Sequence, residues 1–162
     1  MTTNEPAVSV VVPVRNEAGN VAPLVGEIAR ALEGHWTFEV VYVNDGSPDG
    51  NKAELKRLMA QYPWLRRVRH AQSCGQSAAV RTGVAAARGA LVATIDGDGQ
   101  NDPAFIPAML RALEADAPRV ALIAGQRVGR KASGFKKLQS RIANAVRGTV
   151  LRDGTRDTGC GL

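Results

Sequence analysis

The sequence predicts an α/β protein built on a mostly parallel central sheet with helices on both of its faces. Short apolar runs rich in valine and isoleucine alternate with longer segments whose apolar residues recur at helical spacing. Such alternation favours parallel strand pairing. Clusters of aspartate and glycine follow several of the apolar runs. Because ligands bind at the carboxyl ends of the strands in sheets of this kind, these clusters mark the expected site.

Three segments in the first third of the chain establish the pattern. Val8–Val14 is an unbroken apolar, mostly β-branched run, which is typical of a strand buried on both faces. Apolar residues recur at helical spacing between Asn20 and Leu32, so a helix is expected there. Phe38–Val43 predicts a second buried strand, which the turn-forming residues 44–50 end.

The same alternation continues through the middle of the chain. Asn51–Gln61 has the pattern of a helix, and Leu65–His70 has that of a weaker strand. Gly75–Arg88 carries small residues on nearly every helical face, which would let this helix lie close to its neighbours. Leu91–Ile95 is predicted as a strong strand, and it also runs into aspartate and glycine.

Three further elements are expected in the last third. Pro103 suits a first helical turn and predicts a helix that ends at Ala115. Val120–Ala124 has the composition of another buried strand. Phe135–Leu151 combines an apolar stripe with flanking lysines and arginines. This pattern fits an interfacial amphipathic helix on an anionic membrane, or an ordinary helix packed on the sheet with its cations in solvent.

The chain is basic, with a formal net charge of +6, which indicates nucleic acid, a membrane surface or a phosphorylated small molecule as partner. The cations gather in one small group, Arg66–Arg69, and in a larger one from Arg127 to Arg156. Aromatic residues do not interleave with the larger group, so stacking on exposed bases is not expected. A nucleic-acid partner is therefore not predicted.

The cysteines and the N-terminal segment indicate in which cellular compartment the protein is expected. Cys74 and Cys160 occur without a CxxC pair or nearby histidine ligands, so neither a disulfide framework nor a zinc site is predicted. Met1–Pro6 lacks an apolar signal core, and no apolar run approaches the roughly 18–20 residues that a spanning helix needs. We expect a cytoplasmic protein, with peripheral attachment to the cytoplasmic membrane face left open.

The strongest indication of a site is the segment Asp96-Gly97-Asp98-Gly99-Gln100, directly after the predicted strand 91–95. Two carboxylates one residue apart at a strand end can bind one divalent cation, and hard oxygen ligands suit Mg²⁺ or Mn²⁺. Gln100 would add a carbonyl oxygen. The alternative is an ordinary polar turn. The position after a buried strand favours the metal site.

Two further strand ends carry polar residues. Asp45 follows the second strand and could accept a hydrogen bond from a nucleotide base, although an Asx turn leading into a helix cap is the better explanation when the cluster is taken by itself. After the first strand, Glu17 could accept from ribose hydroxyls and Arg15 could lie near phosphate. A capping segment for the following helix is the alternative there.

A glycine-rich phosphate loop is absent from the sequence: neither GxGxxG nor GxxxxGK[ST] occurs. This argues against a Rossmann dehydrogenase and a P-loop NTPase. A nucleotide diphosphate would have to be held by a metal ion instead, so the paired aspartates and the missing loop support the same hypothesis.

Five sequence blocks occur in an order that is similar to one known family. They are VSVVVPVRNE, VVYVNDGSPDG, GQSAAVRTGVAAARG, the strand into DGDGQNDP, and DTGCGL. The blocks extend over almost the whole chain, and together they are far more specific than any one alone. The sequence resembles the inverting glycosyltransferases of the GT-A fold, family 2, and most closely their polyprenyl- (dolichol-) phosphate mannosyl- and glucosyltransferase branch.

The resemblance implies a donor site made of residues from several of these blocks. Those expected to bind the nucleotide sugar are Pro13, Arg15, Glu17, Asp45, Gly75, Gln76 and Asp96. Those expected to hold the Mg²⁺ or Mn²⁺ ion that bridges the sugar diphosphate are Asp96, Asp98 and Gln100. GDP-mannose and UDP-glucose are the donors that the resemblance favours.

On the acceptor side, the resemblance implies that Arg127 and Arg130 lie near the phosphate of a lipid acceptor and that Asp157 lies near the reaction centre. A lipid phosphate is already ionised near neutral pH, so its attack needs no strong general base. A sugar hydroxyl would need one, and Asp157 is the candidate. The resemblance also favours the interfacial interpretation of Phe135–Leu151.

The expected function is therefore inverting transfer of a hexose from a nucleotide sugar to a polyprenyl phosphate at a membrane surface. Two alternatives stay open: a soluble family 2 enzyme that acts on a saccharide or small-molecule hydroxyl, and a non-catalytic module that binds a nucleotide sugar or nucleic acid. Residues 1–162 are expected to be the nucleotide-sugar-binding portion of a GT-A domain whose acceptor-side part lies further along.

The sequence departs from the family pattern at four positions. Asn44 stands where the first of two acids is usual, and Ser73 where an asparagine is usual. Gly97 and Gly99 replace small apolar residues, which predicts a more flexible loop. None of these departures removes a metal ligand, but each bears on donor affinity or donor choice.

Overall fold

The computed structural model describes residues 5–48, 51–117 and 119–125. The chain divides into two units, residues 1–123 with 161–162 and residues 124–160, and the described residues fall almost entirely in the first. The strands are β1 (Val8–Val14), β2 (Phe38–Asp45), β3 (Leu65–His70) and β4 (Leu91–Thr94). The helices are α1 (Ala18–Leu32), α2 (Asn51–Gln61), α3 (Gln76–Ala86), the 3₁₀ helix η1 (Pro103–Phe105) and α4 (Ile106–Ala115).

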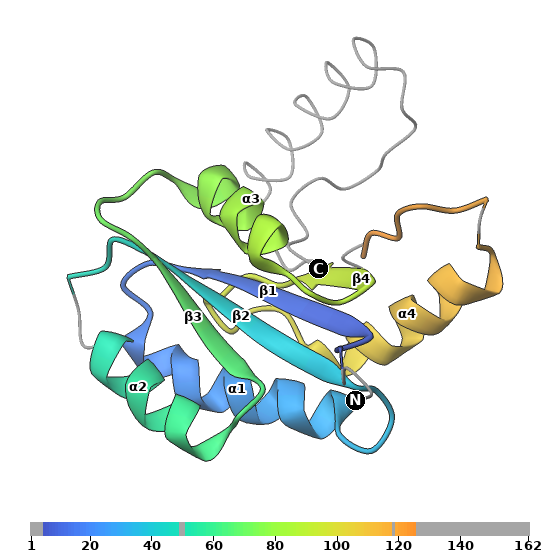
Figure 1. Ribbon diagram of the computed structural model, residues 1–162, viewed down its shortest axis with the longest axis horizontal. Coiled ribbons are helices and arrows are strands. Elements are labelled where there is room, and N and C mark those ends of the chain that lie inside the picture. The colour runs from blue at the N-terminus through green and yellow to red at the C-terminus, as the bar shows by residue number, and fades with distance from the viewer. Residues whose placement is uncertain (1–4, 49–50, 118, 126–162) are drawn as a thin grey trace, which may run out of the picture. The chain divides into compact units, whose positions relative to one another are not determined.

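The four strands form one parallel sheet in the order β3-β2-β1-β4. Figure 1 shows α3 on one face of this sheet and α1 and α2 on the other. Because all four strands run in the same direction, their carboxyl ends meet at one edge, where the loops into the helices begin. The predicted α/β class and parallel sheet are confirmed.

The unbroken valine runs are explained by cores on both faces of the sheet. On one face, alternate residues such as Val10, Val12 and Tyr42 pack with α1 and are fully buried. On the other face, Val11 and the other intervening valines pack beneath α3. Alternation of side chains across a strand requires apolar residues at every position when both faces are covered.

The small residues of α3 allow the close helix packing that the sequence predicts. A Cβ atom placed on Gly83 would lie 2.3 Å from Cγ1 of Val11 and 3.0 Å from Cγ2 of Val43. No side chain fits in that space, so only glycine lets α3 approach β1 and β2 this closely. The helix is thereby fixed over the strands whose ends carry the polar clusters.

Most of the predicted elements are confirmed, with bounds that differ by a few residues. The strand predicted over Val120–Ala124 is wrong: these residues form no strand, and Leu122 is 80% exposed. Apolar composition expresses a preference for burial but does not supply a hydrogen-bonding partner. Residues 121–123 instead line a small apolar cavity of about 140 Å³ together with β4 and α4. The predicted helix 135–151 lies outside the described residues.

Within the described ranges, no helix combines the length and the apolar character that crossing a membrane requires.

Candidate functional site

A pocket of about 320 Å³ opens where the chain leaves β1, β2 and β4. It is lined by Pro13, Val14, Arg15, Glu17, Asp45, Ser73, Gly75, Gln76, Ala79, Asp96, Gly97 and Asp98. The structure therefore brings together every site residue predicted in the described ranges except one. The exception is Gln100, which is exposed and lines a neighbouring pocket with Arg30 and Asn101.

The loop after β1 is tied to the loop after β4 through Asn20. The Nδ2 amide of Asn20 donates to Oε2 of Glu17 at 2.6 Å and to the carbonyl oxygen of Asp98 at 3.2 Å. Glu17 precedes α1 but makes no side-chain capping bond to it, which disfavours the capping interpretation. Its carboxylate is instead directed to the pocket side of the loop by Asn20. Asn20 was not among the predicted site residues.

The two aspartates after β4 differ in their surroundings. Asp96 is half-buried, and its Oδ1 accepts a hydrogen bond from Nε2 of Gln76 at 2.6 Å. Asp98 is exposed, and its Oδ1 accepts from the backbone N–H of Gln100 at 3.0 Å. Each carboxylate keeps an oxygen that no described residue occupies, so this pair has the capacity to bind a cation.

The glycine between these aspartates is required by close packing. A Cβ atom on Gly97 would lie 2.3 Å from Cγ1 of Val14 and 2.8 Å from the carbonyl oxygen of Pro13. Gly97 is buried against the end of β1, so the absence of a side chain there brings the two strand ends together. Gly99, with φ of +73°, takes the left-handed conformation in which glycine is favoured.

Asp45 accepts four hydrogen bonds, more than any other side chain that lines the pocket in the described residues. Its Oδ1 accepts from Nδ1 of His70 at 2.7 Å and from the backbone N–H of Cys74 at 2.8 Å. Its Oδ2 accepts from Oγ of Ser73 at 2.7 Å and from the backbone N–H of Gly75 at 2.9 Å. The carboxylate thus fixes the loop that leads into α3.

The protonation of Asp45 follows from these bonds. Burial by itself would raise the pKa of this carboxyl, since Asp45 is only 3% exposed. The hydrogen bonds from Cys74, His70, Ser73 and Gly75 outweigh burial and hold the pKa well below its usual range. Asp45 is therefore an anion at neutral pH, placed at the N-terminal end of α3 where negative charge is favoured.

The Asx turn considered for this segment is made by the neighbouring residue. The backbone N–H of Ser47 donates to Oδ1 of Asn44 at 2.9 Å. Oγ of Ser47 then accepts from the backbone N–H of Asn16 at 3.1 Å, which ties the β2 loop to the β1 loop. The unusual Asn44 therefore has a defined role in the turn, and Asp45 is left to hold the loop before α3.

Comparison with known proteins identifies the family. The family model for glycosyl transferase family 2 matches residues 9–160. The chain belongs to glycosyl transferase family 2.

Individual family 2 relatives support the same conclusion. A dodecaprenyl-phosphate galacturonate synthase of Rhizobium johnstonii is 37% identical over 99% of this chain and 49% of its own length. An undecaprenyl-phosphate 4-deoxy-4-formamido-L-arabinose transferase of Edwardsiella ictaluri is 34% identical over 96% of this chain and 47% of its own. The chain spans about half the length of these curated relatives.

A solved structure of similar fold is the mannosyltransferase PcManGT of Pyrobaculum calidifontis in complex with GDP-Man and Mn²⁺. It superimposes with a TM-score of 0.65 at 27% identity, over 79% of this chain and 37% of the other. The GT-A fold and the family expected from the sequence are thereby confirmed.

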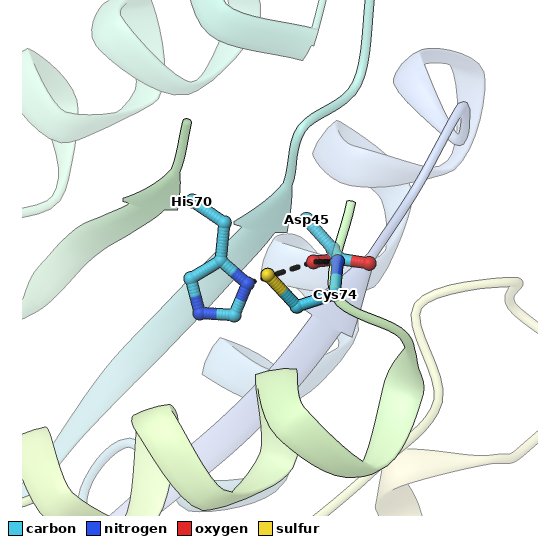
Figure 2. A group of neighbouring side chains, drawn as sticks. All are labelled: Asp45, His70 and Cys74. Atoms are coloured by element: carbon cyan, nitrogen blue, oxygen red, sulfur yellow. Dashed lines mark hydrogen bonds and ion pairs between the residues drawn. The ribbon is translucent and has the colours of Figure 1, made fainter. Parts of the chain in front are cut away.

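Several residues that build this family 2 pocket were missed from the sequence. His70 and Thr82 are linked, because Nε2 of His70 lies 2.9 Å from Oγ1 of Thr82. Figure 2 shows the His70 side chain beside Asp45 and Cys74. Asp45 pairs with His70 in the parallel register of β2 and β3, and that register is a property of the folded sheet that no sequence motif marks.

The predicted acceptor-side residues of this family 2 chain lie outside the described residues. They are Arg127, Arg130 and Asp157. Their roles are proposals, as is the interfacial helix.

Proposed function

We propose that the chain is the nucleotide-sugar-binding part of an inverting, metal-dependent hexosyltransferase that uses a polyprenyl phosphate as acceptor. The observation that carries this proposal is the pocket that brings Asp96 and Asp98 together with Glu17 and Arg15 at one edge of the sheet. Support for the acceptor comes from relatives whose names specify dodecaprenyl phosphate and undecaprenyl phosphate.

The residues present fit Mg²⁺ or Mn²⁺. Asp96 and Asp98 offer hard carboxylate oxygens that line one pocket. The backbone N–H of Gln100 donates to Asp98, and its side chain, which lines the neighbouring pocket, would have to turn toward the ion to add a ligand. When bound, such an ion neutralises the charge of the leaving nucleoside diphosphate. PcManGT, which was solved with Mn²⁺ and GDP-Man, supports both a divalent ion and GDP-mannose as a donor, with UDP-glucose as the second candidate.

Each residue around the ion has its own proposed role. Gln76 orients the Asp96 carboxylate through the 2.6 Å hydrogen bond. Glu17, held by Asn20, accepts from ribose hydroxyls, and Arg15 lies near phosphate. Pro13, Asp45 and Gly75 border the nucleoside end. A base N–H that bonded to Asp45 would have to compete with four donors, so we propose that Asp45 acts largely by fixing Gly75.

The acceptor side completes the proposal. Arg127 and Arg130 would orient an acceptor phosphate that is already ionised, while Asp157 would serve as base if the acceptor were a hydroxyl. Residues 135–151 would lie on an anionic membrane, on the cytoplasmic face. We expect the protein to sediment with anionic vesicles at low salt and less so at high salt. If it bound at neither salt concentration, residues 135–151 would instead be a helix packed on the sheet.

The donor half of the proposal is tested by thermal shift with GDP-mannose and UDP-glucose, in Mn²⁺ and in EDTA. We expect one donor to raise the melting temperature only with Mn²⁺. Asp98→Ala should remove that rise, and Asp116→Ala, an exposed aspartate after α4, should keep it. A rise that is equal in EDTA, or that survives Asp98→Ala, would overturn the metal assignment.

A further inference from the structure

Three side chains of different chemistry meet beside the pocket. Asp45 ends β2, His70 ends β3 and Cys74 lies in the loop before α3. One oxygen, nitrogen and sulfur atom from these three residues all lie within 4.8 Å of one another. Figure 2 shows the three side chains converging from separate segments. This convergence could not be recognised from the spacing of the cysteines, which predicted no zinc site.

We propose that Asp45, His70 and Cys74 form a second cation site, selective for Zn²⁺ and chemically similar ions. Thiolate, imidazole and carboxylate are the ligands that zinc takes in proteins. Mg²⁺ and Mn²⁺ prefer oxygen ligands and belong to the carboxylates of Asp96 and Asp98. The two sites therefore differ in ligand softness, and each is expected to select its own ion.

The cluster is already organised for this role. Oδ2 of Asp45 is held by Ser73 and Gly75, and Oδ1 is turned toward His70 and the backbone N–H of Cys74. The other ring nitrogen of His70 is held by Thr82 at 2.9 Å. A ligand histidine whose second nitrogen is fixed by an outer partner is the arrangement that metal sites require.

The movements needed to bind the ion are small. Zn–N and Zn–O bonds of about 2.0 Å in a tetrahedral site separate two such ligands by roughly 3.3 Å. Nδ1 of His70 and Oδ1 of Asp45 are now 2.7 Å apart, so the ion would replace the hydrogen between them. Cys74 is exposed, and its sulfur, which now donates to the carbonyl oxygen of Gln72, can rotate onto the ion. The thiol proton passes to solvent. The ring proton leaves Nδ1 of His70, and the neutral ring carries its proton on Nε2, which can donate to Oγ1 of Thr82. The fourth position is open to water.

Occupation of this site has a consequence for the pocket. Asp45, Ser73 and Gly75 line the pocket, and Cys74 lies between the last two. An ion on Oδ1 of Asp45 would displace the hydrogen bond from the backbone N–H of Cys74, which now helps to hold the loop before α3. On the basis of the proposed function, we expect Zn²⁺ at this site to weaken donor binding even when Mn²⁺ is in excess.

The test is titration of the metal-free protein with Co²⁺, which gives a near-ultraviolet sulfur-to-cobalt absorption band when a thiolate is a ligand. We expect the band to appear, to be lost when Zn²⁺ is added, and to be absent in Cys74→Ser and His70→Gln. Cys160→Ser is the matched control and should keep the band. Thr82→Val should weaken Co²⁺ binding by roughly 10–100-fold, as loss of an outer-shell partner typically does.

Two outcomes would overturn the proposal: no band in the wild-type protein, or a band that persists in Cys74→Ser. Circular dichroism of each variant checks that it is folded. Asp98→Ala separates this proposal from the donor proposal, because it should keep the cobalt band while losing the Mn²⁺-dependent response to donor. Loss of both responses in folded Asp98→Ala would show that there is a single site and would refute the second one.

Discussion

Strand β2 carries one buried carboxylate near each end, both on the face covered by α3. Glu39 is 4% exposed and Asp45 is 3% exposed, and they are six residue steps, about 20 Å, apart along the strand. Asp45 accepts hydrogen bonds from the backbone at the start of α3. Glu39 accepts one from the backbone N–H of Arg88, just past the end of α3. One strand therefore holds both ends of one helix.

The partners of the two carboxylates differ. Glu39 accepts from Oγ of Ser9 at 2.8 Å and from Nη1 of Arg66 at 2.6 Å, and Arg66 also donates to the carbonyl oxygen of Ala86. Burial would raise the pKa of Glu39, but the bonds from Arg66, Ser9 and Arg88 lower it. Among the described residues Asp45 has no arginine partner, and it lines the pocket at the other end of the strand.

The comparison shows how the site derives from the fold. A carboxylate at either end of β2 stabilises the same helix. In parallel sheets ligands bind at the carboxyl ends of the strands, and there Asp45 lines the pocket beside Gly75 and Gln76. Glu39 lines a separate cavity near the other end of the strand, and we expect its hydrogen bonds to serve stability alone.

The largest expected effect concerns the matched pair Asp45→Asn and Glu39→Gln. Each change replaces one acceptor oxygen by a donor that faces other donors, so each should destabilise the protein by about 1–3 kcal/mol. Asp45→Asn should in addition weaken Mn²⁺-dependent donor binding by at least about tenfold, because Gly75 loses its anchor. Urea unfolding and calorimetric titration of the donor measure the two quantities. If Glu39→Gln weakened donor binding as much as Asp45→Asn does, the proposed difference in role between the two carboxylates would be refuted.

A second prediction tests the helix that lies between the two carboxylates. Gly83→Ala places a methyl group 2.3 Å from Cγ1 of Val11, so α3 must move away from the sheet. We expect a loss of about 1–3 kcal/mol, as overpacked cores show. Gly26→Ala in α1, whose Cβ would meet only the end of Arg30 at 3.6 Å, is the control and should not destabilise. Equal stability of the two variants would show that α3 is not closely packed.

The pH dependence of stability follows from the lowered pKa values of both carboxyl groups. A carboxyl group whose pKa is lower in the folded than in the unfolded state stabilises the fold. Its contribution to the free energy of unfolding is complete above the unfolded pKa, about 4, and is lost as the pH falls through the folded pKa. The free energy of unfolding should therefore stay level from pH 7 to about pH 5 and fall below it. The double variant Asp45→Asn, Glu39→Gln should show a shallower fall. An equally steep fall would mean that other carboxyl groups dominate acid unfolding.

The smallest effect is expected at Tyr42, on the opposite face of β2. Its hydroxyl is buried, finds no hydrogen-bond partner among the described residues, and has a pKa raised by that burial. Tyr42→Phe removes an unsatisfied group and should leave stability unchanged or raise it by up to about 1 kcal/mol. A clear loss of stability in urea unfolding would indicate that the hydroxyl has a partner after all.

The sequence alone predicted the sheet, because its central strands are covered on both faces and are consequently largely apolar, whereas β3 was predicted more weakly from its mixed composition. It also predicted the pocket residues, because Arg15, Asp45 and Asp96 each follow a strand and parallel strands end at one edge. It could not predict that Asp45 has four donors, since they come from segments 25 to 30 residues away. For the same reason it missed Asn20 as the link between Glu17 and Asp98.

The strand predicted over 120–124 failed for a different reason. Its residues 121–123 line a cavity beside β4 and α4 and are largely exposed, and composition alone does not distinguish this arrangement from a buried strand. Pairing in a sheet depends on a neighbour with free backbone groups, and that is a property of the assembled chain rather than of the segment.

The central claim is that a divalent ion on Asp98 connects the protein to the donor diphosphate. Crystals soaked with Mn²⁺ and a nucleoside diphosphate should show an anomalous-scattering peak in contact with the Asp98 carboxylate and with diphosphate oxygens. A nucleotide bound in this pocket with no manganese between it and Asp98 would contradict the account.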